Sequence, residues 1–373
     1  MIRPFRSALG AATGALLVLG SSAWAGTQLV TQSLQPPGSA MARPNDPGSK
    51  HLSTVVFDAD GAYLAAGGDS ANAYVWKVSG LSAAAEARTA WADQAHRSMA
   101  ELDWHGHRPK HALAWSDSAG PDFIALGDTS VAVRLFQGAR LIQGGGFGWS
   151  KNPGQHLLAV RAVDFSPDGQ RLATGSEDRT VRVWDLAGSA EPLRVEGHDH
   201  WVVSADFSPD GQRLATASHD GTARLWSSET GEAQLVLEHP DRVHAVSFSA
   251  DGATLATACH DGLVRLWDAG TGELLRSLSG HRGAVFALAL SPDGSVLASA
   301  GQDASVRLWD VGRGEQLHTL SGSGDAVRSV AFSSDGVLLA APSGDDATQV
   351  LLRALEQDGE LVPWSAETVG SVR

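Results

Sequence analysis

Between residues 198 and 237, short apolar runs alternate with polar turns at a spacing typical of strands. The runs lie at 202–207, 213–218, 222–226 and 233–237. The segments between them are Ser208-Pro209-Asp210-Gly211, His219-Asp220-Gly221 and Glu229-Thr230-Gly231-Glu232. Proline presets the backbone for a tight turn, and glycine takes the left-handed conformation that such turns need. The pattern predicts four short antiparallel strands that form one small sheet.

The predicted third strand recurs along the chain. Its copies are Val181-Arg182-Val183-Trp184-Asp185, Ala223-Arg224-Leu225-Trp226-Ser227, Val264-Arg265-Leu266-Trp267-Asp268 and Val306-Arg307-Leu308-Trp309-Asp310. The four tryptophans are 42, 41 and 42 residues apart. A fixed period of this length indicates stacked or radially repeated units. The chain has 373 residues, of which 43% are hydrophobic and 19% charged, so it has enough apolar material for a packed array.

The landmarks of these units resemble those of the WD-repeat family of β-propellers. They are a Gly-His start, as at Gly197-His198, a Ser-Pro-Asp-Gly turn, a small-x-Asp turn and a Trp-Asp end. The resemblance is strongest over 156–310 and implies an all-β fold, a seven-bladed β-propeller of four-stranded antiparallel blades. The landmarks place the blades at about 51–103, 107–143, 156–195, 198–237, 239–278, 281–320 and 323–365.

Several segments depart from this pattern. Phe136 stands in the tryptophan position of the second unit, and Arg353 stands in that of the seventh. Residues 82–95 are rich in helix formers behind a serine cap, which predicts one short helical insertion in the first blade. The glycine-rich segment 144–149 lacks the Lys-Ser/Thr of a phosphate loop, and we expect a flexible loop beside the second blade.

A propeller needs a strand to cover its last open sheet edge, because exposed edges invite pairing. Residues 26–50 comprise a short N-terminal strand at 28–32 and a Pro/Gly-rich linker, and this strand fits the closure that the family uses. Residues 359–364 also resemble the fourth strand of earlier units, and 367–373 resemble the start of a further first strand. Closure from either end, and an eighth blade, are therefore alternatives.

The first 25 residues have the layout of a secretory signal peptide. Arg3 and Arg6 precede an apolar stretch at 8–20, and Ala23-Trp24-Ala25 forms a small-x-small cleavage signal. The apolar stretch is short for a membrane span. We therefore expect an exported bacterial protein, periplasmic or secreted, with no membrane span after cleavage.

Charge and cysteine content narrow the classes of partner. The formal net charge is −14, and cleavage would remove two arginines and leave −16. An acidic chain without a basic run is a poor partner for nucleic acid, since phosphate binding requires clustered Lys and Arg. Cys259 is the only cysteine, so it cannot form an intramolecular disulfide, and its apolar neighbours predict a buried thiol.

A His, a Ser or Thr, and an Asp recur 28, 10 and 6 residues before the Trp in four units. The sets are His156, Thr174, Asp178, Trp184; His198, Thr216, Asp220, Trp226; His239, Thr257, Asp261, Trp267; and His281, Ser299, Asp303, Trp309. They have the residue types of a hydrolase triad, but a nucleophile occurs once, beside an oxyanion hole. The indole donates, the carboxylate accepts, and the hydroxyl and imidazole do both. The repetition predicts four buried structural networks and no catalytic residue.

Two further groups have a chemical and a structural interpretation. His105, His107 and His111 have a spacing that could bind a metal ion, but Gly106-His107 occupies the Gly-His position of its unit. The structural interpretation is therefore favoured, and no metal or cofactor is predicted. An arginine precedes the tryptophan position in five units, and we expect solvated or inter-blade ion pairs there. These are Arg134, Arg182, Arg224, Arg265 and Arg307.

The resemblance places partner binding on the end of the blades that carries the Gly-His loops and small-x-Asp turns. The residues there vary between units and include Arg161, Glu177, His200, Trp201, Val203, His219, Arg242, His244, His260, Arg282, Phe286, Gln302 and Arg328. Aromatic residues and arginine are enriched at interface centres. Trp201 is the best single anchor candidate, unless it packs against the next blade.

The predicted function is a non-catalytic scaffold that holds a protein or peptide partner and is monomeric by itself. Two other classes are alternatives. One is a propeller that binds a small molecule or sugar, with Trp201, His219 and His260 at the mouth. The other is a metal-assisted propeller enzyme that uses His105, His107 and His111. The step from fold to function rests partly on family analogy.

Overall fold

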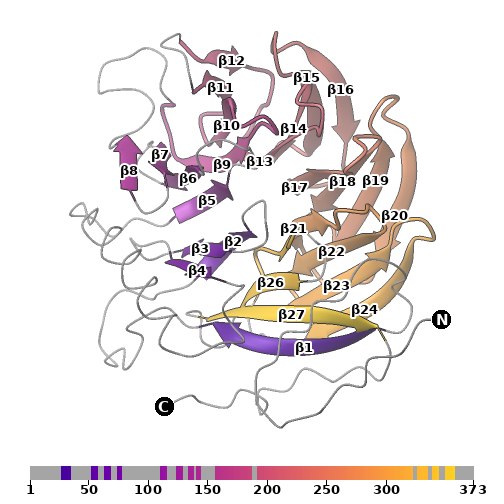
Figure 1. Cartoon of the computed structure of the whole chain (residues 1–373). Coiled ribbons are helices and arrows are strands. Elements are labelled where there is room, and N and C mark those ends of the chain that lie inside the picture. The colour runs from indigo at the N-terminus through magenta and orange to yellow at the C-terminus, as the bar shows by residue number, and fades with distance from the viewer. Residues whose placement is uncertain are drawn as a thin grey trace, which may run out of the picture.

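The alternating segments of the chain form short antiparallel strands, and these strands pair into seven sheets around a common centre in the computed structural model (Figure 1). The structure describes residues 27–34, 52–57, 63–68, 74–77, 110–115, 123–128, 133–137, 140–143, 156–186, 191–321, 326–334, 338–343 and 349–357. Within these residues there is no helix. Six of the sheets have four described strands, and one has three.

The strands follow in chain order, blade by blade. The first two sheets contain β2 (Leu52–Phe57), β3 (Tyr63–Gly68) and β4 (Tyr74–Lys77), then β5 (Lys110–Trp115), β6 (Phe123–Asp128), β7 (Val133–Gln137) and β8 (Arg140–Gln143). The third and fourth contain β9 (Val160–Phe165), β10 (Arg171–Ser176), β11 (Val181–Asp185) and β12 (Leu193–Val195), then β13 (Val202–Phe207), β14 (Arg213–Ser218), β15 (Thr222–Ser227) and β16 (Ala233–Glu238).

The remaining sheets continue this order. The fifth and sixth contain β17 (Val243–Phe248), β18 (Thr254–Cys259), β19 (Leu263–Asp268) and β20 (Leu274–Ser279), then β21 (Val285–Leu290), β22 (Val296–Gly301), β23 (Ser305–Asp310) and β24 (Glu315–Ser321). The last contains β25 (Ala331–Phe332), β26 (Leu338–Ser343), β27 (Gln349–Gln357) and β1 (Thr27–Leu34). The four strands predicted within 198–237 are confirmed, two with identical bounds and two within one residue.

Strand register shows that the units are equivalent even where the sequence diverges. The tryptophan of the third strand faces a leucine of the second strand, as in Leu214↔Trp226 and Leu297↔Trp309. In the second sheet Phe136 faces Ile124, and in the last sheet Arg353 faces Leu339. Phe136 and Arg353 therefore occupy the position that tryptophan holds elsewhere.

The ring is closed by the N-terminal strand. β1 pairs antiparallel with β27 over its whole length, from Thr27↔Gln357 to Leu34↔Val350. This covers the edge of the last sheet, and Figure 1 shows the first and last strands side by side. The C-terminal alternative, 359–364, lies outside the described residues, as do the signal peptide, the helical insertion at 82–95 and the segment 144–149. No helix in the described part is long and apolar enough to cross a membrane.

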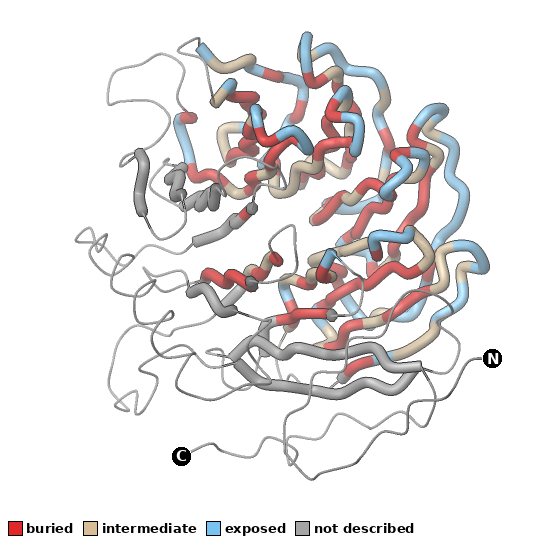
Figure 2. The backbone as a smooth tube through the Cα atoms, in the orientation of Figure 1, coloured by how far each residue is buried: buried red, intermediate tan, exposed pale blue. Residues whose placement is uncertain are grey.

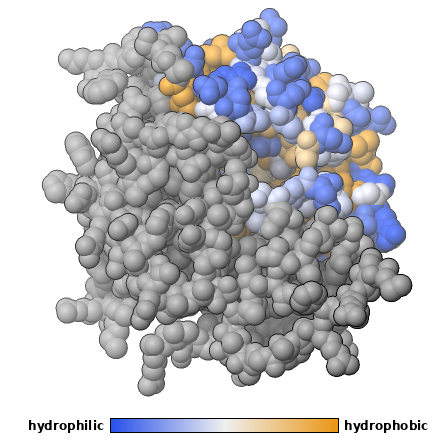
Figure 3. Space-filling view, in the orientation of Figure 1, coloured by the Kyte–Doolittle hydropathy of each residue, from blue (hydrophilic) through white to orange (hydrophobic). Residues whose placement is uncertain are grey.

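The first strand of each sheet lies innermost, and each innermost strand contacts the next one around the ring. Arg171 and Arg213 join neighbouring blades, since they donate to the carbonyls of Gly211 (2.7 Å) and Gly252 (2.7 Å). The second strands are buried along most of their length, whereas the outermost strands β16 and β20 are largely exposed (Figure 2). Where the space-filling view is coloured, hydrophilic side chains alternate with smaller apolar areas (Figure 3). The blades thus form a rigid support that leaves turns and loops free to vary.

Candidate functional site

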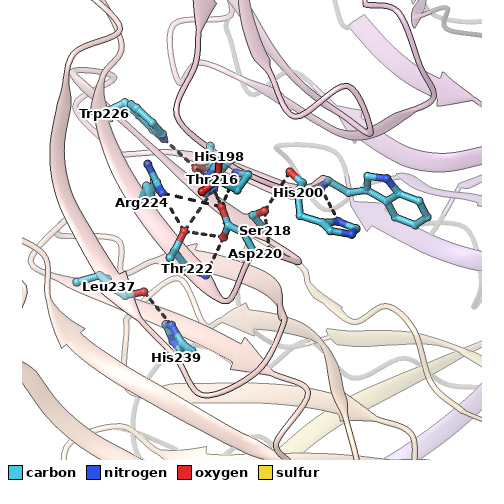
Figure 4. A network of polar contacts seen from close by, with 12 residues as sticks. His198, His200, Thr216, Ser218, Asp220, Thr222, Arg224, Trp226, Leu237 and His239 are labelled. Atoms are coloured by element: carbon cyan, nitrogen blue, oxygen red, sulfur yellow. Dashed lines mark hydrogen bonds and ion pairs between the residues drawn. The ribbon is translucent and has the colours of Figure 1, made fainter.

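The first group of polar residues lies inside the blades. In the fourth blade, Trp226 Nε1 donates to Thr216 Oγ1 (2.8 Å), and His198 Nε2 lies 2.7 Å from the same hydroxyl. His198 Nδ1 lies 2.8 Å from Asp220 Oδ2. This pattern is satisfied when His198 is neutral with its proton on Nδ1 and accepts the hydroxyl proton of Thr216. Figure 4 shows these four side chains converging, while His200 points away from them.

The electrostatics of this network suit a structural role. Burial lowers the pKa of His198, which favours the neutral imidazole. Burial raises the pKa of the Asp220 carboxyl, but hydrogen bonds from His198 and Thr222 outweigh this and hold the pKa well below its usual range. The hydroxyls at this position, Thr174, Thr216, Thr257 and Ser299, have 0% exposure, so no substrate can reach them. The hydrogen bonds join the strands and turns of the blade and do not form a nucleophile.

The same network occurs in the third and sixth blades, through His156 to Trp184 and through His281 to Trp309. The fifth blade differs, so the prediction of four equivalent networks is wrong at Asp261. There His239 Nδ1 donates to the Leu237 carbonyl (2.9 Å), and Asp261 pairs instead with Arg265 (2.6 Å). The other blades carry Thr180, Thr222 or Ser305 two residues after the aspartate, and its hydroxyl bonds the carboxylate. Leu263 stands at this place, and it has no hydroxyl.

The arginines before the tryptophans also differ from expectation. Arg265 and Arg307 pair with Asp261 and Asp303 of their own blades, and Arg224 lies 4.0 Å from Asp220. The predicted inter-blade or solvated pairs are therefore wrong for these three residues. Arg182 is buried, and the side chain of Arg134 lies outside the described residues. Each of these arginines stands four residues after the aspartate that it approaches. The turn between the two residues brings both side chains to the same side of the blade, which explains the ion pairs.

The second group of polar residues lies at the end of the blades where the innermost strands begin. Six of these strands, all except β25, have a register shift against their neighbour. In blades three to six, the shift leaves Arg161, Val203, His244 and Phe286 without a partner across the strand pair. A β-bulge of this kind redirects the side chain of the extra residue, and bulges are common beside functional sites. The shift presents a different residue in each blade.

A turn residue lies sixteen positions after each bulge residue: Glu177, His219, His260 and Gln302. Two of the pairs are in direct contact. Arg161 Nε donates to Glu177 Oε1 (2.7 Å), and His244 Nε2 lies 3.0 Å from His260 Nδ1. Bulge and turn residues thus meet at the same end of the blade.

Ring contacts connect the blades at this end. The Arg161 guanidinium lies 5.4 Å from the centroid of the Trp201 ring, and Trp201 lies 5.7 Å from His219. His219 contacts His244 (5.1 Å), which contacts Phe286 (5.2 Å). Arg328 completes the series, 4.9 Å from Phe286. We call this surface the histidine face; it comprises Arg161, Glu177, His200, Trp201, His219, Arg242, His244, His260, Arg282, Phe286, Gln302 and Arg328, each exposed or half-buried.

Two histidines of this face, His219 and His244, are held neutral. Burial, together with the nearby Arg242 and the other imidazoles, lowers the pKa of His219 to about 4. Burial and the imidazoles of His219 and His260 lower the pKa of His244 to about 4. At neutral pH the face therefore presents aromatic and imidazole rings beside guanidinium groups.

The printed contacts of Trp201 are with the preceding blade and its own blade rather than with the next one, and its role as an anchor stays a prediction. Its ring contacts Arg161 of the preceding blade and His219, yet 37% of the residue is exposed. Arg242, Arg282 and Gln302 lie at the same end, and each forms a hydrogen bond with a loop of its own blade. Leu157 and Leu158, exposed by 78% and 49%, lie there too and were missed from the sequence. In the sequence, the apolar pair Leu157-Leu158 stands where the next unit has Asp199-His200, and this difference could have identified both leucines.

The histidines of the metal hypothesis are not among the side chains that the structure describes. His105 and His107 lie outside the described residues, and His111 lies on β5 with its side chain undescribed. Among the described residues, no group of three His, Cys, Asp or Glu side chains has the arrangement of a metal site. Cys259 is buried, and burial raises the pKa of its thiol to about 11, as expected for a thiol in the core.

Comparison with known proteins agrees with this architecture. The family profile described as "WDR90, 4th beta-propeller" matches residues 159–289, and "WD domain, G-beta repeat" matches 272–310 and 314–348. The crystal structure of the WD40 beta propeller domain of Doa1 superposes with a TM-score of 0.65 at 19% identity, covering 90% of this chain and 98% of that one.

Curated relatives match over shorter stretches. The general transcriptional corepressor TUP1 of Saccharomyces cerevisiae is 42% identical over 55 residues, which is 15% of this chain and 8% of that protein. The probable cytosolic iron-sulfur protein assembly protein 1 of Mycosarcoma maydis is 33% identical over 106 residues, 25% of this chain and 23% of that protein. Protein groucho of Drosophila melanogaster is 28% identical over 158 residues, 40% of this chain and 17% of that protein. The chain thus spans less than a quarter of the length of each of these relatives. Repeat landmarks, four-stranded sheets and profile matches agree: the chain belongs to the WD-repeat family of β-propeller proteins.

Proposed function

We propose that this protein is a non-catalytic scaffold that holds a protein or peptide partner on the histidine face. One observation carries the proposal. Aromatic, imidazole and guanidinium side chains from consecutive blades form an unbroken series of ring contacts from Arg161 to Arg328. Partly exposed aromatic residues beside arginine are the side chains that dominate binding energy at protein interfaces.

The contrast with the interior supports a binding role over a catalytic one. The repeated hydroxyl and histidine groups are buried and mutually bonded, so they are accounted for by folding. The residues of the histidine face differ between equivalent positions, so packing of the blade does not fix them. The relatives include a transcriptional corepressor and a protein of iron-sulfur protein assembly, and a protein partner is consistent with both names.

The proposal includes a location. The layout of residues 1–25 supports export to the periplasm or beyond the cell, where the mature chain works without a membrane span. The partner is then an exported or surface protein.

A small-molecule ligand is the second candidate. Trp201, His219 and His244 form a continuous series of ring contacts, and flat rings of this kind also hold sugars and other small ligands. The histidine face is spread over several blades, however, and this extent favours a larger partner.

The test replaces Trp201, His244 and Phe286 together by alanine. The matched control replaces Val236, Leu274 and Leu275, which are exposed on outer strands by 46%, 45% and 50%. We expect both variants to fold, and only the first to lose the partner recovered by crosslinking in the native compartment and identified by mass. An unchanged partner set in the first variant would contradict the proposal, and recovery of a small ligand alone would favour the second candidate.

A further inference from the structure

Charge distribution distinguishes the histidine face from the rest of the chain. The chain carries a net charge of −14, yet the face contains Arg161, Arg242, Arg282 and Arg328. The acids described at this end outside the interior networks are Glu177, Asp199, Asp241, Glu196, Glu238 and Asp261, of which Glu196 and Asp261 pair with Arg194 and Arg265. Glu177 is already bound to Arg161. Within the described part of the chain, no carboxylate forms an ion pair with Arg242, Arg282 or Arg328.

The lowered pKa values of His219 and His244 indicate which charges lie close to these two side chains. After burial, the groups that depress the pKa of His219 are the guanidinium groups of Arg242 and Arg161 and the imidazoles of His200 and His260. For His244 they are His219, His260 and Arg242, and Asp241 is the only acid that acts in the opposite direction. A pKa lowered by neighbouring cations means that the position favours negative charge. The arginines close to His219 and His244, Arg161 and Arg242, thus outnumber the single nearby acid, Asp241.

The arginines are also oriented for carboxylates. Arg328 lies over Phe286 and Arg161 lies over Trp201, so one flat side of each guanidinium covers a ring. Stacking of this kind leaves the N–H edge of a guanidinium available for planar acceptors. Glu177 occupies part of that edge at Arg161, which shows the geometry that a partner's carboxylate would adopt. Arg328 has no such acid among the described residues.

We propose that the histidine face selects an acidic partner segment in which carboxylates flank an aromatic or aliphatic side chain. The carboxylates contact Arg242, Arg282 and Arg328, and the apolar side chain packs on the exposed ring of Trp201 and the half-buried ring of Phe286. This inference rests on the proposed function, since it names the chemical class of partner for the same surface. Charge complementarity with Arg242, Arg282 and Arg328 is the feature that favours this class over a neutral or basic one.

Binding of such a segment is coupled to proton uptake and therefore depends on pH. The charged and titratable groups that act on the pKa of His219 and His244 are Arg161, Arg242, Asp241, His200 and His260, and His219 also acts on His244. Carboxylates brought next to His219 and His244 raise the pKa of both imidazoles, so the complex takes up protons that the free protein does not. Binding therefore strengthens as pH falls from about 7.5 toward about 5.5, in the range where peptide carboxylates stay ionised.

The test measures fluorescence anisotropy of the full chain with labelled ten-residue peptides. Each peptide has a central Trp-Leu pair flanked by Glu, by Gln or by Lys. We expect the Glu peptide to bind about tenfold more tightly than the Gln peptide, since several exposed ion pairs together contribute about the 1.4 kcal/mol that corresponds to tenfold. The preference should shrink from 50 to 500 mM salt because of screening, and it should grow at pH 5.5.

Single arginine substitutions identify the residues that produce the preference for the Glu peptide. Arg242→Glu and Arg328→Glu should each weaken binding of the Glu peptide about two- to fivefold or more. Arg313→Glu is the control, because Arg313 lies in the turn between β23 and β24 at the other end of the blade. Equal binding of the Gln or Lys peptide, or no binding of any peptide, would overturn the acidic class. The proposed function fails separately, if the triple alanine variant still recovers its partner.

Discussion

His198 and His200 are two residues apart in the chain but occupy opposite environments. His198 is buried, both of its ring nitrogens are hydrogen-bonded, and its network recurs in the third and sixth blades. His200 is exposed and contacts Trp201 and His219, and no equivalent residue in the other units is a histidine. The same side chain thus serves packing where it repeats, and we propose that it serves recognition where it does not. We therefore expect substitutions in the interior networks to lower stability. Substitutions on the histidine face should weaken binding with little loss of stability.

The largest contrast is between two tryptophans of one blade. Trp226 is 2% exposed and donates to Thr216, so Trp226→Ala should lower the free energy of unfolding by about 3–5 kcal/mol. Trp201→Ala should lower it by less than about 1 kcal/mol, because a third of the residue is already solvated. Denaturant unfolding of both variants measures this difference. Equal losses would mean that Trp201 is a packing residue.

A smaller effect is expected at the network hydroxyl. Thr216→Val keeps the shape of the side chain but leaves Trp226 Nε1 and His198 Nε2 without their partner. Each orphaned buried group costs about 1–3 kcal/mol, so we expect a loss of about 2–4 kcal/mol. Thr319→Val on the outer strand β24 is the control, since Thr319 is exposed and should change stability by less than about 0.5 kcal/mol.

If Thr216→Val were as mild as its control, the interior networks would not hold the blades together. The difference in the free energy of unfolding between Trp226→Ala and Trp201→Ala would then come from apolar packing alone. Partner binding by folded Thr216→Val should be unchanged at a temperature well below its unfolding transition, because Thr216 is buried.

The smallest effect concerns the electrostatics of the histidine face. Arg242→Ala removes a cation that disfavours the imidazolium form, so the pKa values of His219 and His244 should rise from about 4. The pKa of His239 is also about 4, but its causes are burial and groups of its own network, with no contribution from Arg242. An NMR titration should therefore show upward shifts at His219 and His244 and none at His239. A shift at all three would indicate a general structural change.

The repeated part of the protein was predictable because its cause is local. Alternation sets the strands, Pro, Asp and Gly set the turns, and constant offsets place His198, Thr216, Asp220 and Trp226 together. The exception at Asp261 was also visible in the sequence, since Leu263 stands where the third, fourth and sixth units carry Thr or Ser. The arginine pairs were mistaken because the turn before the third strand brings Asp261 to Arg265, and alternation alone does not show this.

The histidine face was predictable as a set of residues but not as a surface. The varying positions identified Arg161, His244 and Phe286, but the bulges that present them are register shifts without a sequence signature. The contact between His219 and His244 also depends on how neighbouring blades approach, which a single unit cannot specify. Leu157 and Leu158 were missed because exposed apolar residues resemble ordinary core residues in a sequence.

We propose that the partner binds on the histidine face and not on the outer strands. The most direct measurement places a photo-crosslinking amino acid, p-benzoylphenylalanine, at position 201 in one variant and at position 236 on the outer strand β16 in another. Both positions are exposed, so both report a partner that comes close. We expect a specific crosslinked partner from position 201 and none from position 236. A partner captured at position 236 and absent at position 201 would contradict the account.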